Sequence, residues 1–197
     1  FRTIKNKIST LIKDNSKIIS IGGDHSVSFP IIDAMADKYE QLNILHLDAH
    51  ADLYDTFDNN PYSHASPFAR IMEGGKINSL TQVGIRTLNT HQREQAQKFG
   101  VNVIEMKEFN FDFIPSLLSP LYISLDLDVL DPAFAPGVSH HEPGGMTTRD
   151  LIRVIQSISV NIVGADIVEY NPIRDINNMT AMVAYKLLKE LAAKMVE

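Results

Sequence analysis

Short apolar segments alternate with longer segments of helical periodicity along most of the chain. The short segments are bounded by Gly, Pro, Asn and Asp, which predicts β-strands, and the longer ones carry apolar residues three and four positions apart, which predicts amphipathic helices. The expected strands cover residues 17–21, 43–47, 80–85, 101–106, 121–125 and 161–167, and the expected helices cover residues 1–14, 29–39, 67–73, 91–99, 148–158 and 178–195. This alternation predicts an α/β fold, a three-layer αβα arrangement around an open parallel sheet.

Acidic and imidazole side chains follow one of the most apolar of these strands. In the segment NILHLDAHAD, Ile44 and Leu47 give way to Asp48, His50 and Asp52. Side chains two positions apart share a face of an extended strand, so these three are expected to converge just beyond its carboxyl end. Unpaired carboxylates there would be costly, which favours a divalent metal site over the alternative of an exposed loop.

A second strand repeats this arrangement. In LYISLDLDVLDP the apolar residues are followed by Asp126 and Asp128, two positions apart, whereas Asp131 lies in the next turn and is expected to support ligands rather than be one. His25 lies in a glycine turn, GGDHS, after residues 17–21. A histidine in a turn is weak evidence alone, but the carboxyl ends of parallel strands share one edge of the sheet.

The candidate ligands therefore comprise four carboxylates and two imidazoles: His25, Asp48, His50, Asp52, Asp126 and Asp128. They are too many for one tetrahedral zinc ion but suit two ions that share a carboxylate, and oxygen-rich ligation favours Mn²⁺, two per chain. Paired ions lower the pKa of a water between them, as attack on an unreactive carbon such as that of a guanidinium requires. Glu169, just past residues 161–167, would then face a cationic substrate.

Two long polar loops are expected to form the walls of the pocket. Residues 54–66 follow the first ligand group and contain His64, which either overhangs the site or is a solvated loop residue. Residues 133–145 form the second loop. Their hydrogen-bond donors could hold a substrate carboxylate: Asn59, Asn60, Ser63, Ser139, His140 and His141.

Composition narrows the class of protein. The 197 residues are 44% hydrophobic and 21% charged, as in soluble globular proteins. A net charge of −6 with scattered Lys and Arg indicates neither a nucleic-acid surface nor a membrane patch. There is no Cys, which excludes disulfides and thiolate ligands, and no apolar run reaches the roughly 18 residues of a membrane span.

Four motifs together resemble the ureohydrolases, the arginase and agmatinase superfamily: GGDHS, DAHAD, SLDLDVLDP and ADIVEYNP. The segments YSHASPFARIMEGG and PAFAPGVSHHEPGG are most similar to the plant-type arginases. The resemblance implies one ureohydrolase domain over residues 1–197, without the α/β segment that family members carry before the GGDH turn. It also implies an intracellular protein, in the cytoplasm or a mitochondrion, that forms a homo-oligomer, a trimer or hexamer.

The resemblance also implies roles for single residues. One manganese ion would be held by His25, Asp48, Asp52 and Asp126, and the other by Asp48, His50, Asp126 and Asp128. His64 would shuttle protons and Glu169 would contact the guanidinium. Tyr54 stands where animal arginases have an Asn that helps to read the amino-acid end of the substrate, which leaves substrate choice open.

The expected activity is hydrolysis of L-arginine to L-ornithine and urea, with agmatine to putrescine and urea as the alternative. A third hypothesis is a catalytically silent relative that binds a guanidino compound or serves as an assembly subunit. It is disfavoured because the ligand set, His64 and Glu169 are all present. A nucleotide-sugar enzyme of the DxD type is weaker still, since Asp126 and Asp128 alone would leave DAHAD unexplained.

Overall fold

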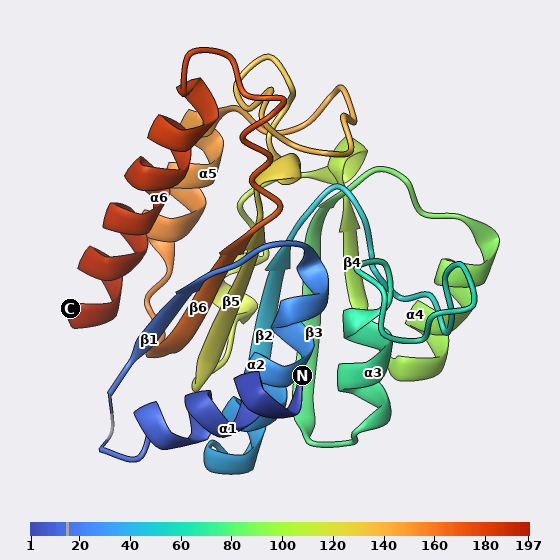
Figure 1. Ribbon diagram of the computed structural model, residues 1–197, viewed down its shortest axis with the longest axis vertical. Helices are drawn as coiled ribbons and strands as arrows, with labels where there is room; N and C mark the ends of the chain where they lie inside the picture. Colours follow the sequence, from blue (N-terminus) through green and yellow to red (C-terminus); the bar gives the residue numbers. More distant parts are fainter. Residues whose placement is uncertain (15) are drawn as a thin grey trace.

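The structure, a computed structural model, describes residues 1–14 and 16–197 and has helices on both faces of a central sheet (Figure 1). The strands are β1 (Ile18–Ile21), β2 (Leu42–Leu47), β3 (Ile77–Ile85), β4 (Asn102–Glu105), β5 (Leu121–Asp126) and β6 (Ile162–Val168). The longer helices are α1 (Arg2–Leu11), α2 (Ser28–Lys38), α3 (Pro67–Glu73), α4 (Thr90–Phe99), α5 (Thr148–Ser157) and α6 (Met179–Val196). The predicted α/β class is confirmed.

All strand pairs in the described ranges are parallel, in the order β1-β6-β5-β2-β3-β4. The central strands β2, β5 and β6 are buried at every position, which explains their nearly continuous apolar sequences. The order places β2 and β5, which precede the two acidic segments, side by side at the centre of the sheet.

Two apolar cores cover the two faces. One joins the sheet to α5 and α6 through residues such as Leu125, Ile155 and Leu187, and the other joins it to the α1–α4 side through Ile32, Phe68 and Tyr122. Figure 1 shows α5 and α6 together on one side of the sheet and α1, α2 and α3 on the other. This is the three-layer arrangement expected from the sequence.

Local signals fix where helices begin and end. The Thr147 and Asp150 side chains form a capping box at the start of α5, and Asn89 accepts a hydrogen bond from the Gln92 N–H at the start of α4. Gly100 ends α4 with a left-handed backbone, φ 65°. Two short 3₁₀ helices, Met106–Glu108 and Ile114–Ser116, lie between β4 and β5.

One border of the sheet carries exposed apolar side chains. Within the described residues β1 pairs with β6 alone. Ile21 is 71% exposed, and Tyr185 on α6, which lines the same surface hollow, is also exposed. None of the helices in the described ranges is both long and apolar enough to cross a bilayer.

Candidate metal centre

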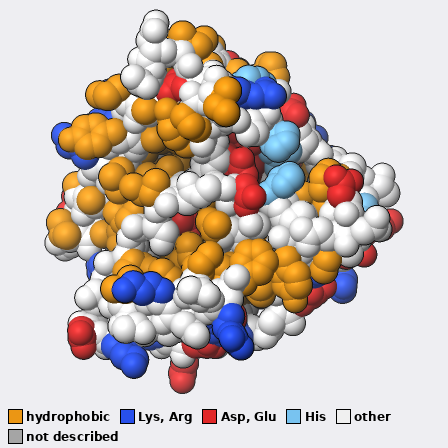
Figure 2. Space-filling model, viewed as in Figure 1, with side chains coloured by type: hydrophobic (Ala, Val, Ile, Leu, Met, Phe, Trp, Pro, Cys, Tyr) orange, Lys and Arg blue, Asp and Glu red, His pale blue; other side chains and the backbone are white. Residues whose placement is uncertain are grey.

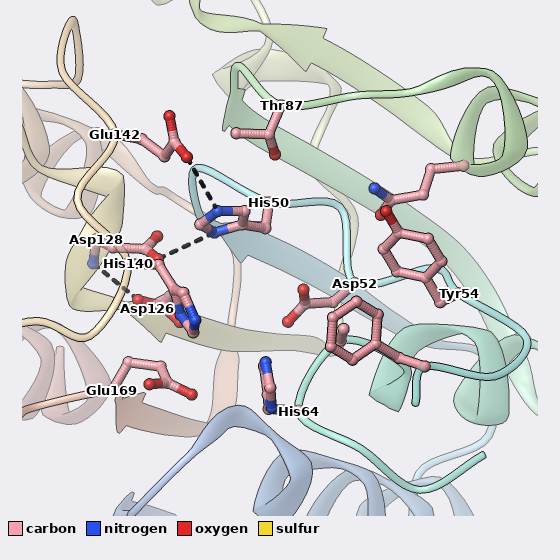
Figure 3. Close-up of a pocket in the computed structure, with 13 residues that line it drawn as sticks. His50, Asp52, Tyr54, His64, Thr87, Asp126, Asp128, His140, Glu142 and Glu169 are labelled. Carbon is pink, nitrogen blue, oxygen red and sulfur yellow. Dashed lines mark hydrogen bonds and ion pairs between the residues drawn. The ribbon is translucent and has the colours of Figure 1, made fainter. Parts of the chain in front are cut away.

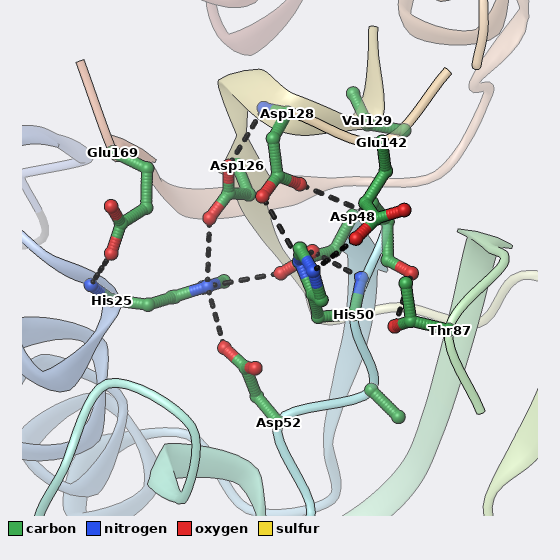
Figure 4. Close-up of polar contacts among 12 residues, drawn as sticks. His25, Asp48, His50, Asp52, Thr87, Asp126, Asp128, Val129, Glu142 and Glu169 are labelled. Atoms are coloured by element: carbon green, nitrogen blue, oxygen red, sulfur yellow. Dashed lines mark hydrogen bonds and ion pairs between the residues drawn. The ribbon is translucent and has the colours of Figure 1, made fainter. Parts of the chain in front are cut away.

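The carboxyl edge of the sheet gathers the acidic and imidazole side chains predicted from the sequence. Asp48, His50 and Asp52 follow β2, and Asp126 and Asp128 stand at the end of β5. His25 opens a 3₁₀ turn after β1, and Glu169 follows β6. Figure 4 shows these side chains pointing toward one another.

The predicted reason for this convergence, alternation along an extended strand, is wrong. β2 ends at Leu47, and the backbone of Asp52 is left-handed, φ 51°. Asp48 Oδ1 instead accepts a hydrogen bond from the His50 N–H at 2.6 Å, and Asp126 Oδ1 accepts one from the Asp128 N–H at 2.7 Å. The spacing of two therefore reflects a turn in which an aspartate binds the backbone two residues on.

The first donor cluster surrounds the ring of His25, which is 1% exposed. Its Nδ1 lies 3.0 Å from Asp48 Oδ2, 3.1 Å from Asp52 Oδ2 and 3.2 Å from Asp126 Oδ2. None of these contacts has hydrogen-bonding geometry, so Nδ1 is a buried nitrogen without a hydrogen-bond partner among the described residues. A single proton on Nδ1 cannot hydrogen-bond to three carboxylates at once, whereas one metal cation can contact all three.

The other ring nitrogen of His25, Nε2, is held by a hydrogen bond. Nε2 lies 3.0 Å from Ser124 Oγ, and that hydroxyl donates to Asp166 Oδ1 at 2.8 Å. Because the hydroxyl proton is directed at Asp166, the serine oxygen accepts from Nε2–H. The lone pair of Nδ1 is then directed at the three carboxylates, as a metal ligand requires.

The second cluster lies beside the first and shares Asp48. His50 Nδ1 lies 3.0 Å from Asp128 Oδ2 and 3.4 Å from Asp48 Oδ1. The donor atoms of Asp48, His50 and Asp128 all lie within 4.8 Å of one another. Asp128 Oδ1 accepts from the Ala49 N–H at 3.1 Å, which fixes the direction of that carboxylate.

Burial and mutual repulsion perturb the protonation of both clusters. Burial, together with the charges of Asp128 and Asp48, raises the pKa of Asp126 well above its usual range. Burial and the charge of Asp48 raise the pKa of Asp128 to about 7. Burial opposes protonation of His50, but Asp128 and Asp48 outweigh it and raise its pKa to about 12. The cluster thus attracts positive charge strongly.

These residues fit a pair of divalent cations. The donors are oxygen and imidazole, the set that suits manganese-like ions, and His25 Nδ1 lacks any other partner in the described chain. Asp48 belongs to both clusters, so this carboxylate would help to hold both ions. The metal would be held by the six residues named from the sequence, now found around one point.

A pocket of about 200 Å³ opens over the clusters (Figure 3). Its lining includes the cluster residues His50, Asp52, Asp126 and Asp128, and in addition His64, His140, Glu169 and Tyr54. Figure 2 shows the acidic and histidine side chains together in a hollow of the surface. The His64 and His140 rings stack, with centroids 5.3 Å apart and planes inclined by 17°.

Glu169 is tied to the same turn as His25. Its Oε1 accepts from the His25 N–H at 2.8 Å, and its own N–H donates to the Gly23 carbonyl at 2.9 Å. Burial raises the pKa of Glu169, although the His25 N–H opposes this. A cation in the pocket would therefore be a favourable neighbour for this carboxylate.

The structure does not bring all the predicted loop donors into the pocket. His140 lines it, but Asn59, Ser63 and Ser139 do not belong to the lining. Ser63 is buried with its hydroxyl 3.2 Å from that of Ser66, Ser139 accepts a hydrogen bond from Asn171 Nδ2 at 3.0 Å, and Asn59 is exposed. Asn60 and His141 also lie outside it.

Sequence reasoning missed several supporting residues: His46, Gln82, Arg86, Ser124 and Asp166. The signal available for His46, Ser124 and Asp166 was a polar side chain inside a mostly apolar strand that is buried at every position. Gln82 lies in the buried half of β3, a strand with several polar residues, so its signal was weaker. Arg86 directly follows the last residue of β3. Its guanidinium donates to the carbonyls of Asp128 at 2.7 Å and Glu142 at 2.6 Å.

The fold and this donor set define an α/β protein with a candidate two-ion centre at the carboxyl edge of a parallel sheet. Comparison with known proteins narrows the class further, since the model of the Arginase family matches residues 1–193. The chain belongs to the arginase family.

Relatives of known name support this membership. Arginase 1, mitochondrial, of Arabidopsis thaliana is 53% identical over 183 residues, which are 88% of this chain and 54% of the relative. An agmatinase of Bacillus cereus is 36% identical over 194 residues, 95% of this chain and 67% of the relative. The solved arginase of Medicago truncatula superposes with a TM-score of 0.90 at 47% identity, covering 98% of this chain and 65% of that one. The chain thus spans little more than half the length of the Arabidopsis relative.

Proposed function

We propose that the protein hydrolyses a guanidino compound with two manganese ions per chain, and that the substrate is L-arginine. The observation that carries this proposal is the pair of donor clusters sharing Asp48 at the floor of a pocket that Glu169 and His64 also line. Two such ions, when bound, supply Lewis acidity and lower the pKa of a water molecule enough for nucleophilic attack near neutral pH.

Glu169 is proposed to bind the guanidinium. One oxygen is engaged by the His25 N–H, so the other is available to accept N–H groups of a cation. The left-handed backbone at this residue, φ 64°, brings the side chain from the end of β6 toward the pocket. Binding of a cation would also offset the cost of burying this carboxylate, a burial that raises the pKa of Glu169.

His64 is proposed to carry the proton that the reaction must deliver. Hydrolysis breaks the bond between the guanidino carbon and the side-chain nitrogen, and the leaving amine takes up a proton. His64 is half-buried at the pocket wall, between the metal ligands and solvent. Its partner in the stack, His140, has its pKa lowered by burial and by the nearby His50 and His64, which favours a neutral ring there.

Arginine is favoured over agmatine because the pocket wall is polar where the two substrates differ. The wall offers Tyr54, Thr87, Gln92 and His140, which can bind an α-carboxylate directly or through water. The names of relatives agree with this choice, since plant arginases are 47–53% identical and the Bacillus agmatinases 36%.

A urea-release assay with arginine and agmatine, each with Mn²⁺ and after chelation, tests the proposal. We expect Mn²⁺-dependent urea release and a kcat/KM for arginine about 10² or more above that for agmatine, because donors left unpaired disfavour the shorter substrate. A higher kcat/KM for agmatine would identify an agmatinase. Arginine binding without urea from either substrate would identify a silent relative.

A further inference from the structure

A chain of buried hydrogen bonds runs behind Asp48, on the side away from the pocket. Gln82 Nε2 lies 2.6 Å from the Ala51 carbonyl oxygen and 3.0 Å from His46 Nδ1. His46 Nε2 lies 2.7 Å from Asp48 Oδ2. His46, Asp48 and Gln82 are all 0% exposed, and His46 and Gln82 are direct partners in the register of β2 with β3.

The Ala51 carbonyl fixes the orientation of the Gln82 amide. A carbonyl oxygen only accepts, so the Gln82 atom 2.6 Å away is the nitrogen, which donates. That nitrogen carries a second hydrogen, directed at His46 Nδ1. His46 Nδ1 must therefore accept, which places the ring proton on Nε2.

The proton on Nε2 is directed at Asp48 Oδ2. The imidazole ring itself is held by Phe68, whose ring stacks on it with centroids 3.8 Å apart and planes inclined by 27°. The opposite oxygen, Asp48 Oδ1, accepts from the His50 backbone N–H at 2.6 Å. Both oxygens of Asp48 are thus held by one N–H each, which leaves their remaining lone pairs directed at the two donor clusters.

We propose that His46 is a positioning residue that orients Asp48 to bridge the two ions, and that Gln82 fixes the tautomer in which it does so. This inference rests on the proposed two-ion function. The donor atoms of His46 also lie within 4.8 Å of those of His25 and Asp48, the arrangement of a ligand group. A ligand role is disfavoured because both ring nitrogens already have partners.

Three substitutions of His46 test whether the N–H that it donates to Asp48 matters, or only the presence of a polar side chain at this position. In His46→Gln the side-chain amide nitrogen takes the place of Nε2, so a donor to Asp48 is kept. In His46→Asn the amide takes the place of Nδ1 and contacts Gln82 only, and His46→Leu removes both contacts. Mn²⁺ affinity is measured by titration calorimetry, with ions per chain from elemental analysis.

We expect His46→Leu and His46→Asn to weaken Mn²⁺ binding about 10- to 100-fold, the usual effect of removing a partner of a metal ligand. His46→Gln should bind within about threefold of the parent, since its donor remains. Equal weakening in the Gln and Asn variants, or none in either, would overturn the proposal. If His46→Leu does not fold, the Gln and Asn pair carries the comparison.

The tautomer is tested without substrate, first in the chelated protein and then with Zn²⁺. Long-range ¹H–¹⁵N spectra of the histidines in the chelated protein should show His46 protonated at Nε2 only, and Gln82→Leu should lose this fixed state. A proton on Nδ1, or on both nitrogens, would overturn the assignment. Diamagnetic Zn²⁺ should leave the Nε2 proton in place, whereas a ligand role would displace it. Because these spectra need no activity, failure of the hydrolase proposal is distinguished from failure of this one.

Discussion

At the scale of single residues, the site is made of side chains whose directions are set by nearby backbone N–H groups. Asp48, Asp126 and Glu169 accept from the N–H groups of His50, Asp128 and His25, respectively. A carboxylate held in this way loses little rotamer freedom when a cation binds. The turns that provide the N–H groups are therefore as much a part of the site as the carboxylates.

The first residue-scale prediction concerns His64. His64→Asn is expected to keep both metal ions and to lower turnover about 10²- to 10⁴-fold, because an amide cannot carry the proton to the leaving amine. Steady-state urea release with elemental analysis checks this. His141→Asn is the matched control, since His141 is exposed and lies outside the pocket lining. Unchanged turnover in His64→Asn would show instead that His64 is a solvated loop residue without a role in proton transfer.

The sequence identified the ligand candidates because they are charged residues at the ends of strands with buried faces, a position that requires compensation. It could not identify His46 and Gln82 as a pair, because their contact depends on the register between β2 and β3. The acceptors of Arg86 are backbone carbonyls, which have no sequence signature. Which loop donors reach the pocket depends on loop conformation, which periodicity does not encode.

At the scale of elements, Arg86 links the end of β3 to the Asp128 turn and to the 133–145 loop. Its guanidinium donates to the carbonyls of Gly84, Asp128 and Glu142. It also lies 3.4 Å from the carbonyls of Val129 and Leu130, and a lysine ammonium, with three donors on one nitrogen and no planar fork, cannot serve all five carbonyls at once. The position of Asp128 and of the loop carrying His140 therefore depends on this one side chain.

We expect Arg86→Lys to lower the free energy of unfolding by about 1–3 kcal/mol, through carbonyls left without partners. It should also weaken Mn²⁺ binding, because the turn of Asp128 is released. Urea denaturation and metal titration measure the two effects. The control is Arg93→Lys at an exposed pair with Glu105, where less than about 1 kcal/mol is expected. Equal effects at the two positions would count against the linking role of Arg86.

A second element-scale feature is a group of four charges joining α1, α2 and the start of β3. Lys5 and Lys76 each contact both Asp33 and Asp37, at 2.6–2.7 Å. Burial raises the pKa of Asp33, but the two ammonium groups outweigh it and lower the pKa below its usual value. A carboxyl whose folded pKa is depressed stabilises the protein above its unfolded pKa, and that stability is lost as pH falls through the folded pKa.

Asp33→Asn should therefore lower the free energy of unfolding by up to about 1 kcal/mol at pH 7. Well below pH 4 it should change this free energy very little, because the parent carboxyl is also protonated there. Urea denaturation of both proteins across this range gives the difference. About 1 M NaCl should reduce it at pH 7. The exposed Glu94, replaced by Gln, serves as control. If Asp33→Asn lowers the free energy of unfolding by the same amount at every pH, the effect comes from packing of the side chain and not from its charge.

At the scale of the whole molecule, the buried acidic clusters make the metal-free fold electrostatically unfavourable. Burial, together with the repulsion between neighbouring carboxylates, raises the pKa of Asp126 and of Asp128, which shows the cost of ionising them in the fold. An ion that binds only the folded state stabilises it, by about 2.7 kcal/mol at a hundred times its Kd. The stability of the domain should therefore depend on its metal content.

Saturating Mn²⁺ is expected to raise the Tm by roughly 5–10 °C over the chelated protein, given about 2–4 °C per kcal/mol for a domain of this size. Scanning calorimetry measures the shift. Asp126→Asn should show little of it, because a neutral amide is a poor bridge between two cations. The ligand assignment would be contradicted if Mn²⁺ did not change the Tm of the parent, or if it raised the Tm of Asp126→Asn by as much as that of the parent.

The left-handed backbone of Glu169, φ 64°, has a cost that the side chain of the same residue offsets. Such a conformation costs a residue with a side chain about 1 kcal/mol relative to glycine. Glu169→Gly would remove that cost, but it would also leave the buried His25 N–H without the acceptor that Glu169 Oε1 provides, at about 1–3 kcal/mol. A library screened for heat resistance alone should therefore not enrich glycine at this position, and a library screened for urea release should eliminate it.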